Sequence, residues 1–169
     1  APLVADIGTG SGCLAVSIAH AVPQCRVVAS DVSADALRVA RDNARHHRVA
    51  DRIAFVLTSY LDGIAPPFDL IVANPPYVKS GDGPALSRPV HYEPAVALFG
   101  GDTGLRDVAG VLDAAVRALA PDGGLIMEFG YGQEDDVRAL VSARPALHLD
   151  HVRSDFQGIP RTAVIGRAS

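Results

Sequence analysis

The sequence lacks the residues that mark several classes of protein. Among its 169 residues there is no tryptophan, one methionine and only two cysteines, Cys13 and Cys25. Two cysteines cannot supply the four ligands of a structural zinc site, and they make a poor disulfide framework. We therefore predict no metal site and expect a reduced, cytoplasmic setting.

Long apolar runs and an excess of positive charge are also missing. No stretch approaches the ~20 apolar residues that a membrane-spanning helix requires, so no membrane segment is predicted. The 15 Lys and Arg residues are outnumbered by 19 Asp and Glu residues, which gives a net charge of −4 at pH 7. This balance argues against a protein whose affinity rests on neutralising the phosphates of nucleic acid.

The chain has the composition and length of one compact domain. Hydrophobic residues make up 49% of its 169 residues, and a domain typically has roughly 150 residues. It begins without Met, and Ala1-Pro2-Leu3-Val4-Ala5 is typical of a buried strand. We therefore expect residues 1–169 to be one domain of a longer protein.

Short apolar segments alternate with segments of helical periodicity, which is typical of a doubly wound α/β sheet. Strands are predicted at residues 3–7, 26–30, 53–57, 68–73 and 125–129, helices at 12–20, 33–47, 105–120 and 133–143, and a turn at 121–124. Two last strands, 147–152 and 162–166, have no helix between them, so we expect them to pair antiparallel at one sheet edge. Between 79 and 104 the periodicity is lost, which is typical of a lid, a binding loop or disorder.

A glycine-rich turn separates the first strand from the first helix, and it reads Asp6-Ile7-Gly8-Thr9-Gly10-Ser11-Gly12. Glycines there allow positive φ and let a ligand approach the bare backbone at a helix N-terminus, although a tight turn needs glycine in any case. Asp31 closes the second strand, where a carboxylate can accept both hydroxyls of a ribose. The pattern predicts a nucleoside cofactor, either a dinucleotide or S-adenosylmethionine. The glycine spacing and the acid at Asp6 favour the latter.

The tetrapeptide Asn74-Pro75-Pro76-Tyr77 directly follows the strand at 68–73. The two prolines fix the backbone and remove two amide donors, so the Asn74 side-chain oxygen and the Pro75 carbonyl are left as acceptors. Two acceptors at a fixed separation suit a planar –NH₂ group, with one hydrogen bond to each proton, and Tyr77 can pack against that flat group.

A planar amide or aryl amine is a poor nucleophile because its lone pair is delocalised. Holding both protons directs the lone pair toward an electrophile and stabilises the positive charge that develops on nitrogen. The sulfonium methyl of S-adenosylmethionine is such an electrophile, so the tetrapeptide favours a methyltransferase over a dehydrogenase that uses a dinucleotide.

These motifs resemble those of the protein-(glutamine-N5) methyltransferases, and above all of the release factor glutamine methyltransferases. The similarity covers nearly the whole chain and extends to three further segments: Glu93-Pro94-Ala95-Val96-Ala97-Leu98-Phe99-Gly100-Gly101-Asp102-Thr103-Gly104-Leu105, Asp122-Gly123-Gly124-Leu125-Ile126-Met127-Glu128 and Gly158-Ile159-Pro160-Arg161. The resemblance implies a Rossmann-like, mostly parallel seven-stranded sheet with an antiparallel edge strand, of the class I S-adenosylmethionine-dependent methyltransferases.

The resemblance also implies roles for individual residues. The cofactor would contact Gly8, Thr9, Gly10, Ser11 and Gly12, its ribose would contact Asp31, its adenine Tyr60, and Asn74 would also face it. The substrate glutamine amide would lie on Asn74, Pro75, Pro76 and Tyr77, with Asn74, Pro75 and Tyr77 catalytic. The family's usual acid at the end of the third strand is here Ser59, so the chain departs from the family on the adenine side.

The substrate that the resemblance implies is the glutamine of the Gly-Gly-Gln tip of class I peptide-chain release factors. Members also carry a helical N-terminal domain that grips the release factor, and we expect it to be absent from residues 1–169. Two other interpretations stay open. The acceptor could be an exocyclic amine of a flipped base in DNA or RNA, or the chain could bind cofactor without activity in the absence of its N-terminal part.

Overall fold

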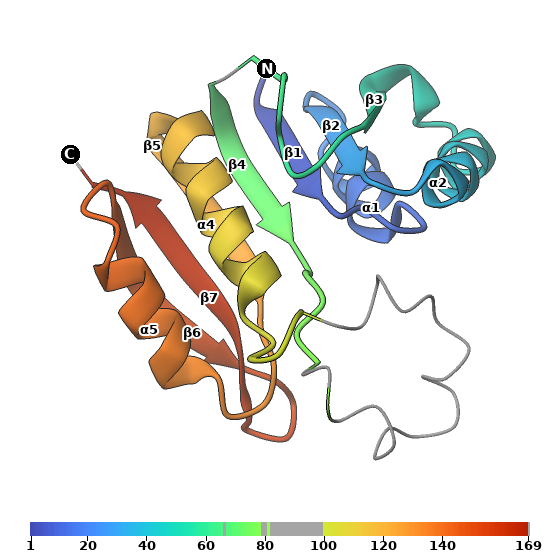
Figure 1. The fold of residues 1–169 in the computed structure, drawn as a ribbon. Helices are drawn as coiled ribbons and strands as arrows, with labels where there is room; N and C mark the ends of the chain where they lie inside the picture. The colour runs from blue at the N-terminus through green and yellow to red at the C-terminus, as the bar shows by residue number, and fades with distance from the viewer. Residues whose placement is uncertain (66, 79–80, 82–99, 169) are drawn as a thin grey trace.

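The computed structural model describes residues 1–65, 67–78, 81 and 100–168 of the chain. Within these residues seven strands form one sheet, in the order β3-β2-β1-β4-β5-β7-β6 (Figure 1). The strands are β1 (Leu3–Ile7), β2 (Arg26–Asp31), β3 (Ile53–Leu57), β4 (Phe68–Ala73), β5 (Leu119–Glu128), β6 (Leu147–Ser154) and β7 (Pro160–Arg167). The helices are α1 (Cys13–Ala21), α2 (Ala34–His46), α4 (Arg106–Ala118) and α5 (Glu134–Ser142), with a short 3₁₀ turn η1 (Ala50–Arg52). The predicted fold class is confirmed.

The sheet is parallel from β3 to β5, and β7 runs antiparallel to both β5 and β6. The predicted antiparallel pair therefore lies at one edge of the sheet. Within the pair, β6 takes the outermost position, and the strand of opposite direction, β7, lies one place inward. Because the other strands run the same way, their carboxyl ends meet at one edge.

Helices cover both faces of the sheet, and each face has its own apolar core. In Figure 1, α4 and α5 lie on the front side of the sheet, where α4 covers β5. The helical periodicity of the sequence explains this placement, because Val108, Val111 and Leu112 fall on one side of α4 and are almost fully buried there. On the other face, α1 buries Ala15 and Val16 against β1 and β2. None of the helices in the described segments has the length and apolarity to cross a bilayer.

The turn predicted at residues 121–124 is wrong as a strand boundary, because β5 already begins at Leu119. Leu119 pairs with Phe68 of β4, and the next paired residues are Gly124 and Leu70. Five steps along β5 thus match two along β4, so the extra residues form a bulge within the strand. Gly123 lies in this bulge so close to the carbonyl of Phe68 that an added Cβ would be 2.8 Å from that oxygen.

Gly12 is the residue at which the chain enters α1, and its backbone requires glycine for two reasons. Its φ is +81°, in the left-handed region that other residues rarely adopt. A Cβ at this position would lie 2.9 Å from the Cβ of Ala40 on α2. Because Gly12 has no side chain, α1 and α2 can pack closely against each other at this point.

Tyr60 lies just after β3 and turns toward α4. Its hydroxyl donates to the Oδ1 atom of Asp107 at 3.0 Å, and its ring occupies the space beside Gly110, where a Cβ would lie within 2.2 Å of the ring carbon Cζ. Burial, together with the hydrogen bond to the Asp107 carboxylate, raises the pKa of Tyr60 to about 12. Tyr60 thereby joins the end of β3 to the first turns of α4.

The two constraints on Gly12 can be separated by a matched pair of variants. Gly132 also has a positive φ, +76°, but has open space where its Cβ would be. We expect Gly132→Ala to lower the free energy of unfolding by about 1 kcal/mol, the cost of the left-handed backbone. Gly12→Ala should lose about 2 kcal/mol or more, because the contact with Ala40 adds overpacking strain. Urea unfolding followed by circular dichroism measures both, and equal losses would contradict the role of Ala40.

The raised pKa of Tyr60 predicts a loss of stability in strong base. The neutral phenol is favoured in the folded state, so the stabilisation is complete below the unfolded pKa of 10 and is lost as pH rises toward 12. Spectroscopic titration of the phenolate should show one of the four tyrosines ionising near pH 12. Tyr60→Phe should remove that step and reduce the loss of stability between pH 10 and 12. Tyr131→Phe, at a side chain that is 77% exposed, is the control that should keep the step.

Candidate functional site

The candidate site lies where β1 and β4 are neighbours in the middle of the sheet. From β1 the chain proceeds to β2 and β3 on one side, and then returns to β4 on the other side. Such a switch of direction leaves a crevice at the carboxyl ends of the two strands, where open α/β sheets bind ligands. Ile7 at the end of β1 is in register with Ala73 at the end of β4. The glycine-rich turn and the Asn74–Tyr77 segment therefore leave the sheet side by side.

A cleft of about 790 Å³ lies at this point. Four segments line it: the turn after β1 with the start of α1, the end of β4 with the residues that follow, and the adjoining ends of β5 and β7. Its lining residues are Asp6, Gly8, Thr9, Gly10, Ser11, Cys13, Leu14, Val72, Ala73, Asn74, Pro75, Pro76, Tyr77, Val78, Ile126, Glu128 and Thr162. The structure thus brings together most of the predicted cofactor residues and all of the predicted substrate residues.

Asp6 holds the glycine-rich turn in shape from inside the protein. Its side chain is buried, and its Oδ2 atom accepts from the Thr9 hydroxyl at 2.6 Å and from the Ala15 amide at 3.0 Å. Burial raises the pKa of this carboxyl, while the hydrogen bonds from Thr9 and Ala15 act in the opposite direction. The Thr9 amide in turn donates to the Ser30 carbonyl on β2 at 2.9 Å. The turn is therefore anchored to both its own helix and the neighbouring strand.

Asp31 holds the same turn from the end of β2. Its two oxygens accept from the amides of Gly10 and Ser33, at 2.9 and 2.8 Å. Asp31 and Gly12 do not line the cleft, and the roles predicted for them toward the cofactor stay predictions. Each carboxylate oxygen of Asp31 still has a second lone pair with which it can accept a ribose hydroxyl.

Tyr60 is the predicted cofactor residue that the structure separates most clearly from the others. It does not line the cleft, and its hydroxyl lies on Asp107 of α4. The contact with an adenine stays a prediction. Ser59, which stands where the resemblance leads us to expect an acid, is exposed.

The Asn74–Tyr77 segment combines a buried proline with an exposed amide. Asn74 is exposed at the end of β4, and Pro75 is buried directly after it. Tyr77 is half-buried, and its hydroxyl donates to the Oε1 atom of Glu128 at 3.4 Å. Glu128 ends β5, so this hydrogen bond joins the segment to the next strand across the cleft.

Sequence reasoning missed one residue that touches this segment, Gln133. It is a buried polar residue directly before α5, and its side-chain amide donates to the Tyr77 carbonyl at 3.2 Å. No local motif distinguishes Gln133, because two of its partners, Tyr77 and Gly104, are distant in the sequence. The segment at 79–104, for which a lid, a binding loop or disorder was predicted, lies largely outside the described residues. Across the residues that the structure describes, no group of three or more His, Cys, Asp or Glu side chains could hold a metal ion.

Comparison of the sequence with known proteins identifies close relatives of this chain. The family described as "Methyltransferase small domain" matches residues 2–87. The release factor glutamine methyltransferase of Bradyrhizobium diazoefficiens is 44% identical over 162 residues, which are 95% of this chain and 54% of that protein. The enzyme of the same name from Nitratidesulfovibrio vulgaris is 41% identical, over 92% of this chain and 54% of that protein. The chain therefore spans about half the length of these relatives.

Solved structures share the fold at lower identity. A ribosomal protein L11 methylase from Lactobacillus delbrueckii has a TM-score of 0.74 and 24% identity, over 100% of this chain and 72% of that one. The magnesium protoporphyrin IX methyltransferase of Synechocystis, solved with bound SAM, has a TM-score of 0.64 and 18% identity, over 99% of this chain and 70% of that one. The strand order of the sheet, the residues that line the cleft and the matched family model all indicate a methyltransferase. The chain belongs to the methyltransferase small domain family.

Proposed function

We propose that the chain is the catalytic part of an enzyme that transfers a methyl group from S-adenosylmethionine to the side-chain amide nitrogen of a protein glutamine. The proposed substrate is the Gly-Gly-Gln glutamine of class I peptide-chain release factors. The observation that carries the proposal is that the glycine-rich turn and the Asn74–Tyr77 segment line one cleft. The 44% identity to a release factor glutamine methyltransferase supports the choice of substrate. The proposal implies a cytoplasmic reaction, the setting expected from the low cysteine content.

The glycine-rich turn fits S-adenosylmethionine, the cofactor that brings the reactive methyl group. Gly8 and Gly10 both have positive φ, and a Cβ added at either would meet no protein atom within 4 Å. The bare backbone of these residues therefore faces open space at the cleft, where a cofactor can approach it closely. Asp31, which ends β2 beside this turn, would accept the ribose hydroxyls.

The Asn74–Tyr77 segment would hold and activate the glutamine amide. The Asn74 side-chain oxygen and the Pro75 carbonyl would each accept one N–H proton, so the nitrogen lone pair is directed at the methyl carbon. As the N–C bond forms and the C–S bond breaks, its electron pair going to sulfur, the two acceptors stabilise the positive charge that grows on nitrogen. One N–H proton then passes to water, so no strong base is needed at the site.

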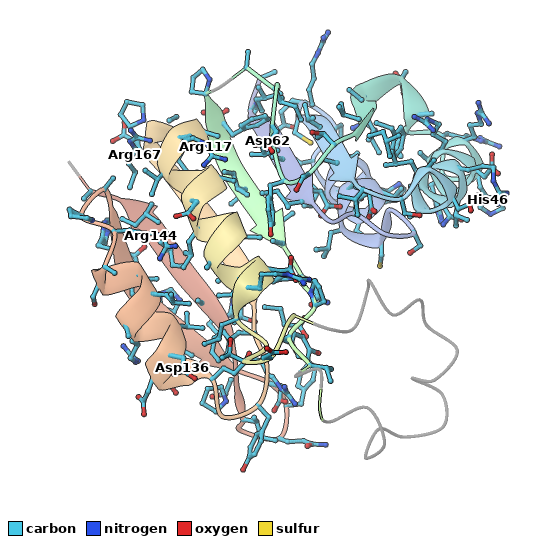
Figure 2. All side chains as sticks on the ribbon, in the orientation of Figure 1. His46, Asp62, Arg117, Asp136, Arg144 and Arg167 are labelled. Carbon is cyan, nitrogen blue, oxygen red and sulfur yellow. The ribbon has the colours of Figure 1, made fainter. Side chains whose placement is uncertain are left out.

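A second candidate substrate is an exocyclic amine of a nucleic-acid base, because it has the same planar –NH₂ group. The acidic residues at this edge of the sheet argue against it. Three consecutive acids, Glu134, Asp135 and Asp136, form the first turn of α5, and Figure 2 shows Asp136 at the end of α5 nearest the turn that follows β5. Glu128 lines the cleft itself. Negative charge at this edge disfavours a phosphate backbone and is compatible with a protein substrate.

The proposed function can be tested with cofactor that carries a labelled methyl group. The protein that contains this chain is incubated with a class I release factor or with DNA, and the products are digested and analysed by mass spectrometry. Label on the glutamine of the Gly-Gly-Gln peptide is expected. Label in DNA instead would overturn the proposed substrate, and calorimetric binding of the cofactor without turnover on any release factor would favour a binding module.

The role of Asn74 predicts a loss of rate without a loss of cofactor. Asn74→Ala should keep its affinity for S-adenosylmethionine and lower kcat by ~10²–10³, the typical cost of losing one group positioned toward developing charge. Asp31→Ala is the contrasting variant, in which cofactor affinity should fall first. Calorimetry and steady-state kinetics measure the two effects. Near-normal turnover by Asn74→Ala would refute the clamp, and unchanged affinity in Asp31→Ala would remove Asp31 from the ribose site.

A further inference from the structure

Gln133 is a buried side chain that joins three separate backbone segments behind the cleft. Its Oε1 atom accepts from the Gly130 amide at 2.8 Å. Its Nε2 atom donates to the carbonyl of Tyr77 at 3.2 Å and to that of Gly104 at 3.4 Å. One amide therefore connects the end of the Asn74–Tyr77 segment, the stretch that leads into α4, and the turn between β5 and α5.

The three segments are packed so closely around Gln133 that a Cβ added to the glycine of two of them would meet its side-chain amide. A Cβ at Gly104 would lie 2.3 Å from the Tyr77 oxygen and 2.8 Å from Nε2 of Gln133. A Cβ at Gly130 would lie 2.7 Å from Oε1 of Gln133. Neither glycine has room for a side chain, so a shift of Gln133 would be passed on to the backbone that it touches.

The Asn74–Tyr77 segment needs an external donor of this kind. Pro75 and Pro76 have no N–H group, so this part of the backbone cannot be anchored through its own donors. The carbonyls and the side chains of the segment are therefore important points of attachment. Gln133 supplies the donor for the Tyr77 carbonyl, and directly beyond it the Gly100 amide donates to the Val78 carbonyl at 2.9 Å.

We propose that Gln133 is a positioning residue for methyl transfer, which fixes the Asn74–Tyr77 clamp through the N–H donors of its side-chain amide. The inference rests on the proposed function, because that function supplies the rate to be measured. It requires that the donor character of Nε2 matters, and not only the volume of the side chain.

Gln133→Glu tests donor character at nearly constant shape. The introduced carboxylate can still accept from Gly130, but its second oxygen would face the carbonyls of Tyr77 and Gly104 without a proton to donate. When protonated, the same carboxyl donates one hydrogen bond and restores part of the anchor. Burial raises the pKa of such a carboxyl. Glu134, the next residue in the chain, acts in the same direction, and its own charge is paired with Arg138 at 2.7 Å.

We expect Gln133→Glu to lower kcat about 10- to 100-fold at pH 8, a cost typical of a small misplacement of reacting groups. Cofactor affinity should stay within about twofold of the parent. The kcat of Gln133→Glu, expressed as a fraction of the parent's kcat at the same pH, should rise as the pH falls toward 6. Gln133→Ala should show a deficit that does not change with pH. Gln24→Glu, the same change at an exposed residue before β2, should match the parent throughout.

A kcat of Gln133→Glu equal to that of the parent at pH 8, or a deficit independent of pH, would overturn the inference. An equal loss of cofactor affinity would also overturn it, since that indicates a general structural role. If Gln133→Glu does not fold, Gln133→Met takes its place, because Met fills a similar space without a donor. Its kcat at pH 8 should be lower by the same about 10- to 100-fold.

Amide hydrogen exchange separates this inference from the proposed function, because it needs no substrate. The Gly130 amide should stay protected in the parent and in Gln133→Glu, and should lose protection in Gln133→Ala. The Gly100 amide should exchange faster in both variants, and unchanged exchange there would overturn the anchoring of the clamp. If the parent chain does not methylate the Gly-Gly-Gln peptide, the proposed function fails while this measurement still decides the role of Gln133.

Discussion

The parallel pairing of β1 with β4 is the contact on which the rest of the site depends. Gly8 and Asn74 are 66 positions apart in the sequence. They become neighbours only because Ile7 at the end of β1 is in register with Ala73 at the end of β4. Because the chain leaves β1 toward β2 and leaves β4 toward β5, on opposite sides, the helices α1 and α4 of these two connections lead away from the space between the carboxyl ends. The cleft is therefore a consequence of strand order, and its chemistry comes from the two segments that the strand order places there.

The two sides of the cleft are made rigid in opposite ways. The glycine-rich turn has backbone amides to donate, and it is held by acceptors, the carboxylates of Asp6 and Asp31. The Asn74–Tyr77 segment lacks amide donors at its two prolines, and it is held by a donor, the side-chain amide of Gln133. Each side thus receives the hydrogen-bonding group that its own backbone does not supply. In the proposed function, the acceptors of Asn74 and Pro75 would then serve the substrate amide.

Much of the fold was predictable because its elements are local. Buried strands and amphipathic helices follow from the apolar pattern, and the predicted bounds of β1, β3 and β4 agree with the structure. The prediction of a turn at 121–124 was wrong because the proline and glycines there form a bulge within β5. This bulge depends on the pairing of β5 with Phe68 of β4. The position of Tyr60 was equally beyond local reasoning, since the space for its ring comes from Gly110 on a helix 50 residues later.

The sequence by itself determined the alternation of strands and helices and the chemistry of the two motifs, because backbone conformation and hydrogen-bonding capacity are properties of the residues themselves. Only the tertiary structure decided which residues meet. It placed Thr162 and Glu128 in the cleft, turned Tyr60 toward Asp107, and buried Gln133 behind Tyr77. These are contacts between distant segments, and they depend on strand register and on the room that each glycine leaves, which no local pattern encodes.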